Sequence, residues 1–148
     1  MRYVKIYVDT NVLINYCTGQ TADVAALKHV FAKRQKHSLF TSSLAIVQTI
    51  SRLQSGNKAR NRKAYSKEKT INELNYLSGK FTVLDLTLAD IKKGFNESSE
   101  DIEDSVHYIL SQKKKCDAIL TNNTKDFTQF NNIKLLETDL GLLKSLIQ

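Results

Sequence analysis

Short apolar runs alternate with helical stretches along most of this 148-residue chain. Runs typical of buried strands lie at residues 4–8, 37–41, 81–84, 118–121 and 133–136. Apolar periodicity and turn residues predict helices at 10–17, 21–36, 44–53, 60–78, 87–95, 101–114 and 140–147. Strands separated by helices need crossover connections, which favour parallel pairing and helices on both faces of the sheet. The chain is therefore predicted to be an α/β protein, a three-layer α/β/α sandwich around a mostly parallel four- to five-stranded sheet.

Length and composition limit the class of protein. A chain of this length fits one domain, and we expect a single domain over residues 1–148. Hydrophobic residues make up 41% and charged residues 25%, which is typical of folded globular proteins. No apolar run approaches the roughly 20 residues of a transmembrane helix, and the N-terminus lacks the pattern of a signal peptide. We therefore expect a cytoplasmic protein that does not associate with membranes.

Asp9 is the most informative single residue. It directly follows the strand predicted over 4–8 and precedes the helix predicted over 10–17. In open α/β folds, ligands and chemistry gather at the carboxyl-terminal edge of the sheet. An acid at this edge, in a chain of net charge +7, indicates a metal site that acts on a polyanion. A helix N-cap is the structural alternative for Asp9.

Two further polar clusters are placed to meet Asp9 at that edge. One is the acidic start of the helix predicted over 101–114, where Asp101 and Asp104 share a face. The other directly follows the strand predicted over 118–121. The structural alternatives are acids that complement a helix dipole and an aspartate that caps a turn. Together the three clusters supply these candidate site residues: Asp9, Thr10, Asn11, Asp101, Asp104, Thr121, Asn123 and Asp126.

Three segments carry a resemblance to a known family: Asp9–Ile14, Asp101–Asp104 and Cys116–Phe127. In this order they look like the PIN domain family, and the resemblance covers nearly the whole chain. It implies an α/β/α nuclease that holds Mg²⁺ or Mn²⁺ on clustered acids and hydrolyses RNA. Many bacterial members are VapC-type toxins paired with a small antitoxin, so the resemblance also implies an antitoxin partner and a homodimer.

The resemblance implies a role for each site residue. The first acid, Asp9, and the later acids Asp101 and Asp104 match residues that bind the metal and carry catalysis. The residues that match supports around them are Thr10, Asn11, Gln48, Thr121, Asn123 and Asp126. Mg²⁺ commonly takes only one or two protein carboxylates beside waters and phosphate oxygens. A bound ion lowers the pKa of its water and screens charge on the phosphate, and the sequence leaves open whether one or two ions act.

Gln48 departs from the family pattern. The helix after the second strand normally carries a glutamate six residues past its capping serine, and counted from Ser42 this position is Gln48. Glutamine can form hydrogen bonds or offer a neutral carbonyl ligand, but it brings no charge. On an amphipathic helix it could also face solvent. We therefore expect weaker metal binding, and the alternative function is a catalytically impaired PIN fold that binds RNA or a protein.

Positive charge concentrates between Arg52 and Lys69, where seven basic residues face one acid and Tyr65 lies among them. Such stretches attract phosphate backbones, and aromatic rings within them can stack on unpaired bases. A solvated helix face or an antitoxin-docking surface is the alternative. The residues expected to contact RNA are Arg52, Lys58, Arg60, Arg62, Lys63 and Tyr65.

Two other features have weaker implications. Helix geometry favours a surface or core-edge position for His107, although it lies three residues beyond Asp104 and could touch substrate. Phosphoryl transfer through an aspartyl nucleophile is a third possible chemistry for Asp9. It is disfavoured because phosphatases of the haloacid dehalogenase type need a second aspartate where this chain has Asn11.

Overall fold

The computed structural model describes residues 3–33 and 35–138. Its strands are β1 (Lys5–Val8), β2 (Ser38–Ser42), β3 (Thr82–Leu84), β4 (Ala118–Leu120) and β5 (Lys134–Leu136). Its α-helices are α1 (Thr10–Cys17), α2 (Thr21–Ala32), α3 (Ser43–Ser55), α4 (Lys67–Ser78), α5 (Leu88–Phe95) and α6 (Ile102–Lys113). Two short 3₁₀ turns complete the set, η1 (Lys58–Arg60) and η2 (Thr124–Phe127).

The sheet has five strands in the order β3-β2-β1-β4-β5, and every described pairing is parallel. Tyr7 of β1 lies opposite Phe40 of β2 on one side and Ile119 of β4 on the other. The chain first builds outward from β1 to β3 and then returns to place β4 beside β1. Such a reversal leaves a crevice at the carboxyl ends of the two central strands.

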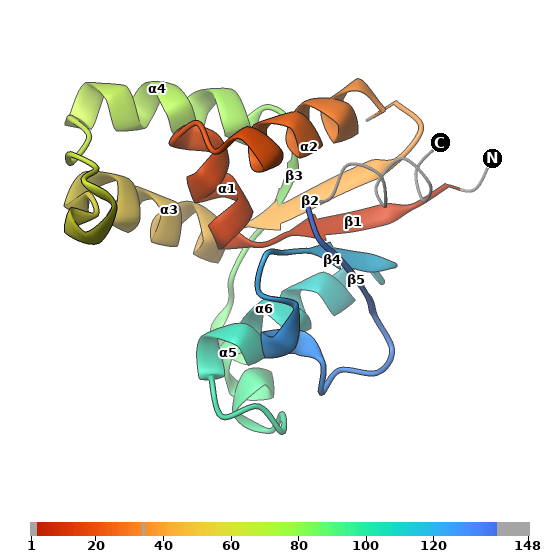
Figure 1. Ribbon diagram of the computed structural model, residues 1–148. Helices are drawn as coiled ribbons and strands as arrows, with labels where there is room; N and C mark the ends of the chain where they lie inside the picture. The colour runs from red at the N-terminus through yellow and green to blue at the C-terminus, as the bar shows by residue number, and fades with distance from the viewer. Residues whose placement is uncertain (1–2, 34, 139–148) are drawn as a thin grey trace.

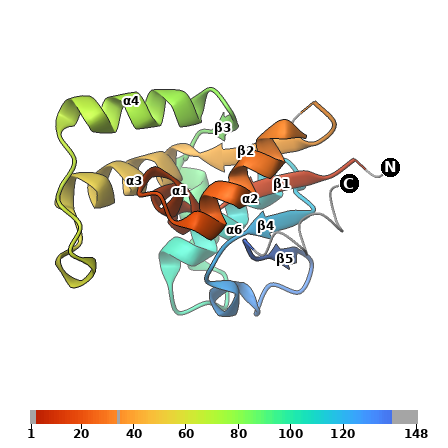
Figure 2. The ribbon, with the colours of Figure 1, turned by 45° about the horizontal axis from the view of Figure 1, so that its top comes forward.

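Helices cover both faces of this sheet (Figure 1). Helices α1, α2, α3 and α4 lie on one side, and α5 and α6 lie on the other, as the turned view also shows (Figure 2). The last three residues of β1 are buried, and their side chains alternate between two apolar cores: Ile6 and Val8 enter the α1–α4 side, and Tyr7 enters the α6 side. The α/β/α sandwich with a parallel five-stranded sheet confirms the predicted fold class.

Two predicted helices, those over 21–36 and 60–78, differ clearly in their bounds from the helices of the structure. The helix predicted over 21–36 ends at Ala32, because its buried stripe stops at Phe31 and the amides of Lys36 and His37 turn back onto the Lys33 carbonyl. The helix predicted over 140–147 lies outside the described residues. Other predicted bounds, apart from those of α4, shift by at most two residues.

The basic helix predicted over 60–78 begins only at Lys67. Gly56 and Asn61 have positive φ angles of 69° and 51°, and Asn57 and Arg62 exchange backbone hydrogen bonds of 2.8 Å. A Cβ on Gly56 would lie 2.7 Å from the Ala64 nitrogen, so only glycine fits this turn. Residues 56–62 therefore form a compact loop, which we call the α3–α4 loop.

Helices α5 and α6 form a hairpin that positions the acidic start of α6. Thr87 and Asp90 make a reciprocal capping box at the start of α5. Lys113 at the end of α6 reaches back to the Asp90 carboxylate at 2.9 Å. Burial alone would raise the pKa of Asp90, but hydrogen bonds from Lys113 and Thr87 outweigh it and hold this pKa below its usual value.

In the described part of the chain, no helix has both the length and the apolar character needed to cross a membrane.

Candidate active site

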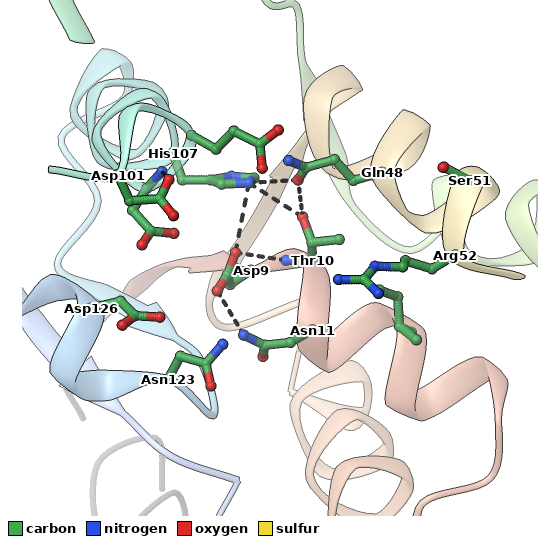
Figure 3. Close-up of a pocket in the computed structure, with 13 residues that line it drawn as sticks. Asp9, Thr10, Asn11, Gln48, Ser51, Arg52, Asp101, His107, Asn123 and Asp126 are labelled. Carbon is green, nitrogen blue, oxygen red and sulfur yellow. Dashed lines mark hydrogen bonds and ion pairs between the residues drawn. The ribbon is translucent and has the colours of Figure 1, made fainter. Parts of the chain in front are cut away.

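A cavity of about 480 Å³ opens at the carboxyl-terminal edge of the sheet (Figure 3). Its walls come from α1, α3, the start of α6 and the turn after β4, which are remote from one another in sequence. All lining residues but Ile14 are polar or charged: Asp9, Thr10, Asn11, Gln48, Ser51, Arg52, Asp101, Glu103, Asp104, His107, Asn123 and Asp126. We call this cavity the acidic pocket.

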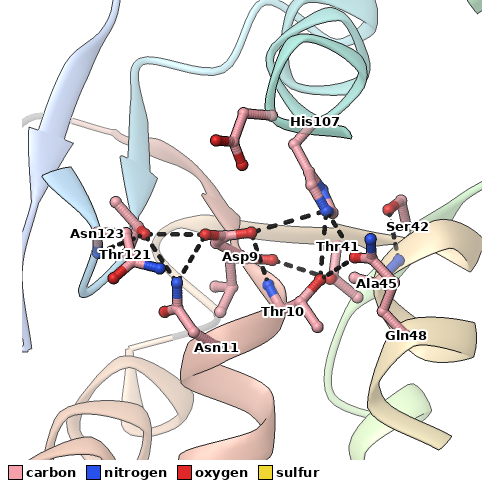
Figure 4. A network of polar contacts seen from close by, with 12 residues as sticks. Asp9, Thr10, Asn11, Thr41, Ser42, Ala45, Gln48, His107, Thr121 and Asn123 are labelled. Atoms are coloured by element: carbon pink, nitrogen blue, oxygen red, sulfur yellow. Dashed lines mark hydrogen bonds and ion pairs between the residues drawn. The ribbon is translucent and has the colours of Figure 1, made fainter. Parts of the chain in front are cut away.

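Asp9 lies buried at the base of the acidic pocket. Its Oδ1 accepts a hydrogen bond from the Thr10 amide at 2.8 Å. Its Oδ2 accepts from Asn11 Nδ2 and from Thr121 Oγ1, both at 2.9 Å (Figure 4). The carboxylate therefore has a fixed orientation, and the predicted supports Thr10, Asn11 and Thr121 supply all three donors.

The turn after β4 is tied to α1 by a second set of contacts. The Asn122 amide donates to Asn11 Oδ1 at 3.1 Å, and the Asn123 amide donates to Thr121 Oγ1 at 3.0 Å. Asn122 Nδ2 also donates to Asp23 of α2 at 2.6 Å. These bonds hold the exposed side chains of Asn123 and Asp126 at the rim of the acidic pocket.

The start of α6 adds two of the predicted acids. Asp101 caps this helix, with its Oδ1 accepting from the Asp104 amide at 3.1 Å. Burial raises the pKa of Asp104 to about 7, and repulsion from neighbouring acids adds to the rise in this order: Asp101, Asp126, Asp9 and Glu103. Ionised Asp104 therefore adds a negative charge beside acids that repel it, which is the electrostatic condition that favours a divalent cation.

The donor chemistry of the acidic pocket suits a divalent ion, because carboxylate and amide oxygens are the ligands that Mg²⁺ and Ca²⁺ take. Within residues 3–33 and 35–138, however, no group of three or more Asp, Glu, His and Cys side chains is arranged to hold one metal ion. Asp9 and Asp104 face the same cavity, and one or two carboxylates with waters are enough for Mg²⁺. The residues thus fit a partly hydrated ion rather than a preformed cage.

Gln48 points into the acidic pocket and belongs to a polar network (Figure 4). Its Oε1 lies 2.6 Å from Thr10 Oγ1 and 2.8 Å from His107 Nε2. The other ring nitrogen of His107 lies 2.7 Å from the Tyr7 hydroxyl, which in turn lies 2.7 Å from Ser42 Oγ. The network therefore joins α1, α3 and α6 across the ends of β1 and β2.

His107 occupies a core-edge position, one of the two that helix geometry favoured, and it lines the acidic pocket. It is 2% exposed, and burial lowers its pKa against the opposing effect of Asp9, Glu103 and Asp101. Ile102 in the first turn of α6 is 52% exposed, whereas His107 is buried, so the buried face of α6 is turned toward His107. The available signal for the burial of His107 was Tyr7, whose hydroxyl is carried by a buried residue of β1 and needs a polar partner.

A sequence model described as the PIN domain matches residues 5–125 of this chain. The chain belongs to the PIN domain family. Among curated proteins, none matches it.

Solved structures share the fold of this PIN domain at low identity. VapBC2 from Rickettsia felis, bound to a DNA fragment from its promoter, has a TM-score of 0.64 at 15% identity, over 90% of this chain and 98% of that chain. DNA-bound VapBC from Salmonella typhimurium has a TM-score of 0.67 at 15% identity, over 91% and 98%. Mycobacterium tuberculosis VapC20, described as a Sarcin-Ricin loop cleaving toxin, has a TM-score of 0.56 at 16% identity, over 77% and 86%.

The basic residues of this PIN domain are spread around the acidic pocket rather than gathered in it. Arg52 of α3 lines the pocket. Arg60 and Arg62 of the α3–α4 loop line a separate hollow of about 300 Å³, and Lys58 and Lys63 are exposed on and beside the same loop. Their contact with RNA stays a prediction.

Tyr65 holds a structural position next to that loop. Its hydroxyl donates to the Cys17 carbonyl at 2.8 Å, and Lys69 Nζ lies 4.1 Å from the centre of its ring. The ring is half-buried against the core on the α1–α4 side of the sheet. Tyr65 therefore anchors the α3–α4 loop to α1, and its stacking on RNA bases stays a prediction.

Proposed function

We propose that this PIN domain is a metal-dependent endoribonuclease that hydrolyses phosphodiester bonds in RNA, and that it acts as the toxin of a toxin–antitoxin pair. The observation that carries the proposal is the meeting of Asp9, Asp101 and Asp104 in one polar pocket. Burial, and after it the repulsion from neighbouring acids, raises the pKa of Asp104, and a bound divalent cation would relieve that repulsion.

In this proposal Asp9 and Asp104 hold Mg²⁺ or Mn²⁺, with Asp101 beside them. When bound, such an ion lowers the pKa of its water and stabilises charge on the phosphate. The protein fixes the Asp9 carboxylate through Thr10, Asn11 and Thr121, so that little reorganisation is needed when substrate arrives. In this proposal Arg52, which lines the pocket, contacts a phosphate of the RNA.

The proposed partners follow from charge and from the similar structures. A net charge of +7 favours association with RNA despite the acids of the pocket. The Rickettsia and Salmonella structures are VapBC complexes bound to DNA, which supports a small antitoxin partner for this chain. We further propose that residues 1–148 form a single PIN domain. Two copies of it would form a homodimer, and the protein would act in the cytoplasm.

A second candidate function is a catalytically impaired PIN fold that binds RNA or protein. Two observations favour it. Gln48 supplies no charge where the family pattern has a glutamate, and no three acids of the described chain are arranged around one ion. Metal titration separates the two functions: RNA binding without divalent binding at millimolar concentration supports the impaired form.

Asp9→Asn tests the nuclease. We expect at least about a 100-fold loss of Mn²⁺- or Mg²⁺-dependent cleavage of single-stranded RNA, the scale of losing one preorganised electrostatic group. Asparagine still caps α1 as well as aspartate does, so the fold is expected to persist. Asp85→Asn, an exposed acid outside the acidic pocket, is the matched control and should cleave like the wild type. Equal cleavage by Asp9→Asn would rule out the proposed mechanism.

A further inference from the structure

Gln48 uses its amide oxygen entirely within the protein. Oε1 accepts hydrogen bonds from Thr10 Oγ1 at 2.6 Å and from His107 Nε2 at 2.8 Å. A carbonyl oxygen has two lone pairs, so two donors occupy it fully. Among residues 3–33 and 35–138, nothing accepts a hydrogen bond from the amide nitrogen Nε2, although the side chain lines the acidic pocket.

The neighbours of His107 decide which way the amide points. Asp9 Oδ1 lies 3.7 Å from His107 Nε2, and a carboxylate at this distance attracts an N–H and repels a nitrogen lone pair. His107 Nε2 therefore carries hydrogen and donates, and the atom of Gln48 that receives it must be the oxygen. An amide turned the other way would place its own N–H groups against this N–H.

The rest of the network is consistent with that assignment. The Ala45 amide donates to Ser42 Oγ at 3.1 Å, which leaves the Ser42 hydroxyl free to donate to Tyr7. The Tyr7 hydroxyl then donates to His107 Nδ1 at 2.7 Å. These hydrogen bonds run in one direction from the first turn of α3 to Gln48, with Thr10 Oγ1 a longer contact of His107 Nε2 at 3.3 Å. The tautomer of a histidine is set by the bond that its other nitrogen makes.

We propose that Gln48 contacts the RNA substrate and does not bind the metal: its amide N–H groups donate to a phosphate oxygen, and His107 is the positioning residue that turns them toward the acidic pocket. This inference rests on the proposed function, because it assigns one residue of that site to the substrate. The structure around Gln48 opposes metal binding, since a cation at Oε1 would have to displace Thr10 or His107. An unpaired N–H is, in contrast, the group that a phosphate oxygen accepts.

The test separates metal binding from RNA binding in the full chain. Mn²⁺ affinity is measured by calorimetry, and RNA affinity is measured with a short single-stranded RNA carrying phosphorothioate linkages, which slow hydrolysis. Gln48→Ala should leave the Mn²⁺ dissociation constant within about 2-fold of the wild type. It should weaken RNA binding by about 10-fold, the scale of one hydrogen bond to a charged group. Gln54→Ala, an exposed glutamine on the same helix, is the matched control and should change neither value.

The opposite pattern overturns the inference. If Gln48→Ala weakens Mn²⁺ binding more than about 5-fold and leaves RNA binding unchanged, the side chain is a metal ligand. Gln48→Glu gives an independent answer. A carboxylate there should tighten Mn²⁺ binding and weaken RNA binding measured without metal, whereas unchanged values for both contradict the proposed contact.

The role of His107 is tested by a double-mutant cycle and by the wild-type spectrum. His107→Ala and Gln48→Ala should weaken RNA binding non-additively, because both remove the same oriented amide. If His107→Ala fails to fold, the nitrogen chemical shifts of His107 in the wild type at pH 8 still show which ring nitrogen carries hydrogen. Hydrogen on Nε2 supports the proposed orientation, and a ring protonated only at Nδ1 overturns it.

Failure of the proposed function gives a different result from failure of this inference. A wild type that neither binds Mn²⁺ nor cleaves RNA refutes the nuclease, while the RNA-affinity and nitrogen-shift measurements still decide the orientation and role of Gln48. A wild type that does both, with Gln48→Ala indistinguishable from Gln54→Ala in RNA affinity, refutes the inference alone.

Discussion

Asp9 and Asp101 each cap a helix while they line the acidic pocket. The Asp9 carboxylate accepts from the first amide of α1, and the Asp101 carboxylate accepts from the Asp104 amide in the first turn of α6. Each of these acids therefore has two roles: it stabilises the start of a helix, and it lines the pocket. Replacing either by alanine would cost about 1 kcal/mol of helix stability in addition to any functional loss. Asparagine keeps one accepting oxygen for the cap, but it removes the charge and replaces the other oxygen with a hydrogen-bond donor.

Asp104 makes the stability of the metal-free protein depend on pH. Its pKa is raised from 3.8 to about 7 in the folded chain, so the folded state holds the proton more tightly than the unfolded state does. The contribution of protonated Asp104 to the stability of the folded state is complete below about pH 4 and is lost as pH rises through about 7. We expect the free energy of unfolding, measured with urea and a chelator, to fall over this range more steeply in the wild type than in Asp104→Asn.

The control for this prediction is Asp85→Asn, which removes an exposed acid and should keep the wild-type slope. Added Mn²⁺ should reverse the effect, because binding of the ion requires the Asp104 proton to leave. Stability curves of the wild type and Asp104→Asn that run parallel between pH 4 and pH 8 would contradict the assigned environment of Asp104.

At the level of elements, the α5–α6 hairpin determines where the acids of α6 lie. Gly94 of α5 faces Val106 of α6 so closely that an added Cβ would lie 2.7 Å from Val106 Cγ2. Val106 precedes His107, so any shift of this contact moves the network around Gln48 as well as Asp104. Close packing of two helices thereby becomes a requirement of the site.

Gly94→Ala should destabilise the protein by about 1–2 kcal/mol. Overpacking costs roughly 1–3 kcal/mol, and the better helix propensity of alanine returns up to about 1 kcal/mol. Gly79→Ala is the matched control, since its Cβ would meet the Tyr76 and Asn75 carbonyl oxygens at 3.5 and 3.7 Å, which are ordinary contacts. Urea unfolding measures both variants, and equal stabilities would show that α5 and α6 separate at little cost.

The elements show what a single sequence can and cannot predict. The order of strands and helices was predictable, because parallel strands buried on both faces consist of short apolar runs bounded by helices. The position of Asp9 and of the segment after β4 at one edge of the sheet was predictable for the same reason, since both follow such runs directly. The rotation of α6 that exposes Ile102 and buries His107 was not, because it depends on the Tyr7 hydroxyl and on the fit of Gly94 against Val106.

At the scale of the whole molecule, the acids of the site and the basic residues of the α3–α4 loop occupy different regions. Five acids line the acidic pocket at the edge of the sheet, whereas the basic residues of the α3–α4 loop lie beyond α3 on the side covered by α1 to α4 (Figure 1). Two further lysines, Lys92 and Lys93, end α5 on the opposite side of the sheet. A net charge of +7 attracts RNA from any direction, but only a local cluster can hold it next to the pocket.

The double variant Lys58→Gln/Lys63→Gln should therefore weaken RNA binding and make it less sensitive to salt. Each phosphate contact removed lowers the slope of log affinity against log salt by about 0.7 for a single strand, so the pair should lower it by up to about 1.4. Lys92→Gln/Lys93→Gln lowers the net charge equally at exposed sites on α5 and should leave the slope near the wild-type value. Affinities measured at several salt concentrations compare the two pairs. Equal slopes in both variants would mean that RNA responds only to the total charge, and that the α3–α4 loop makes no phosphate contact of its own.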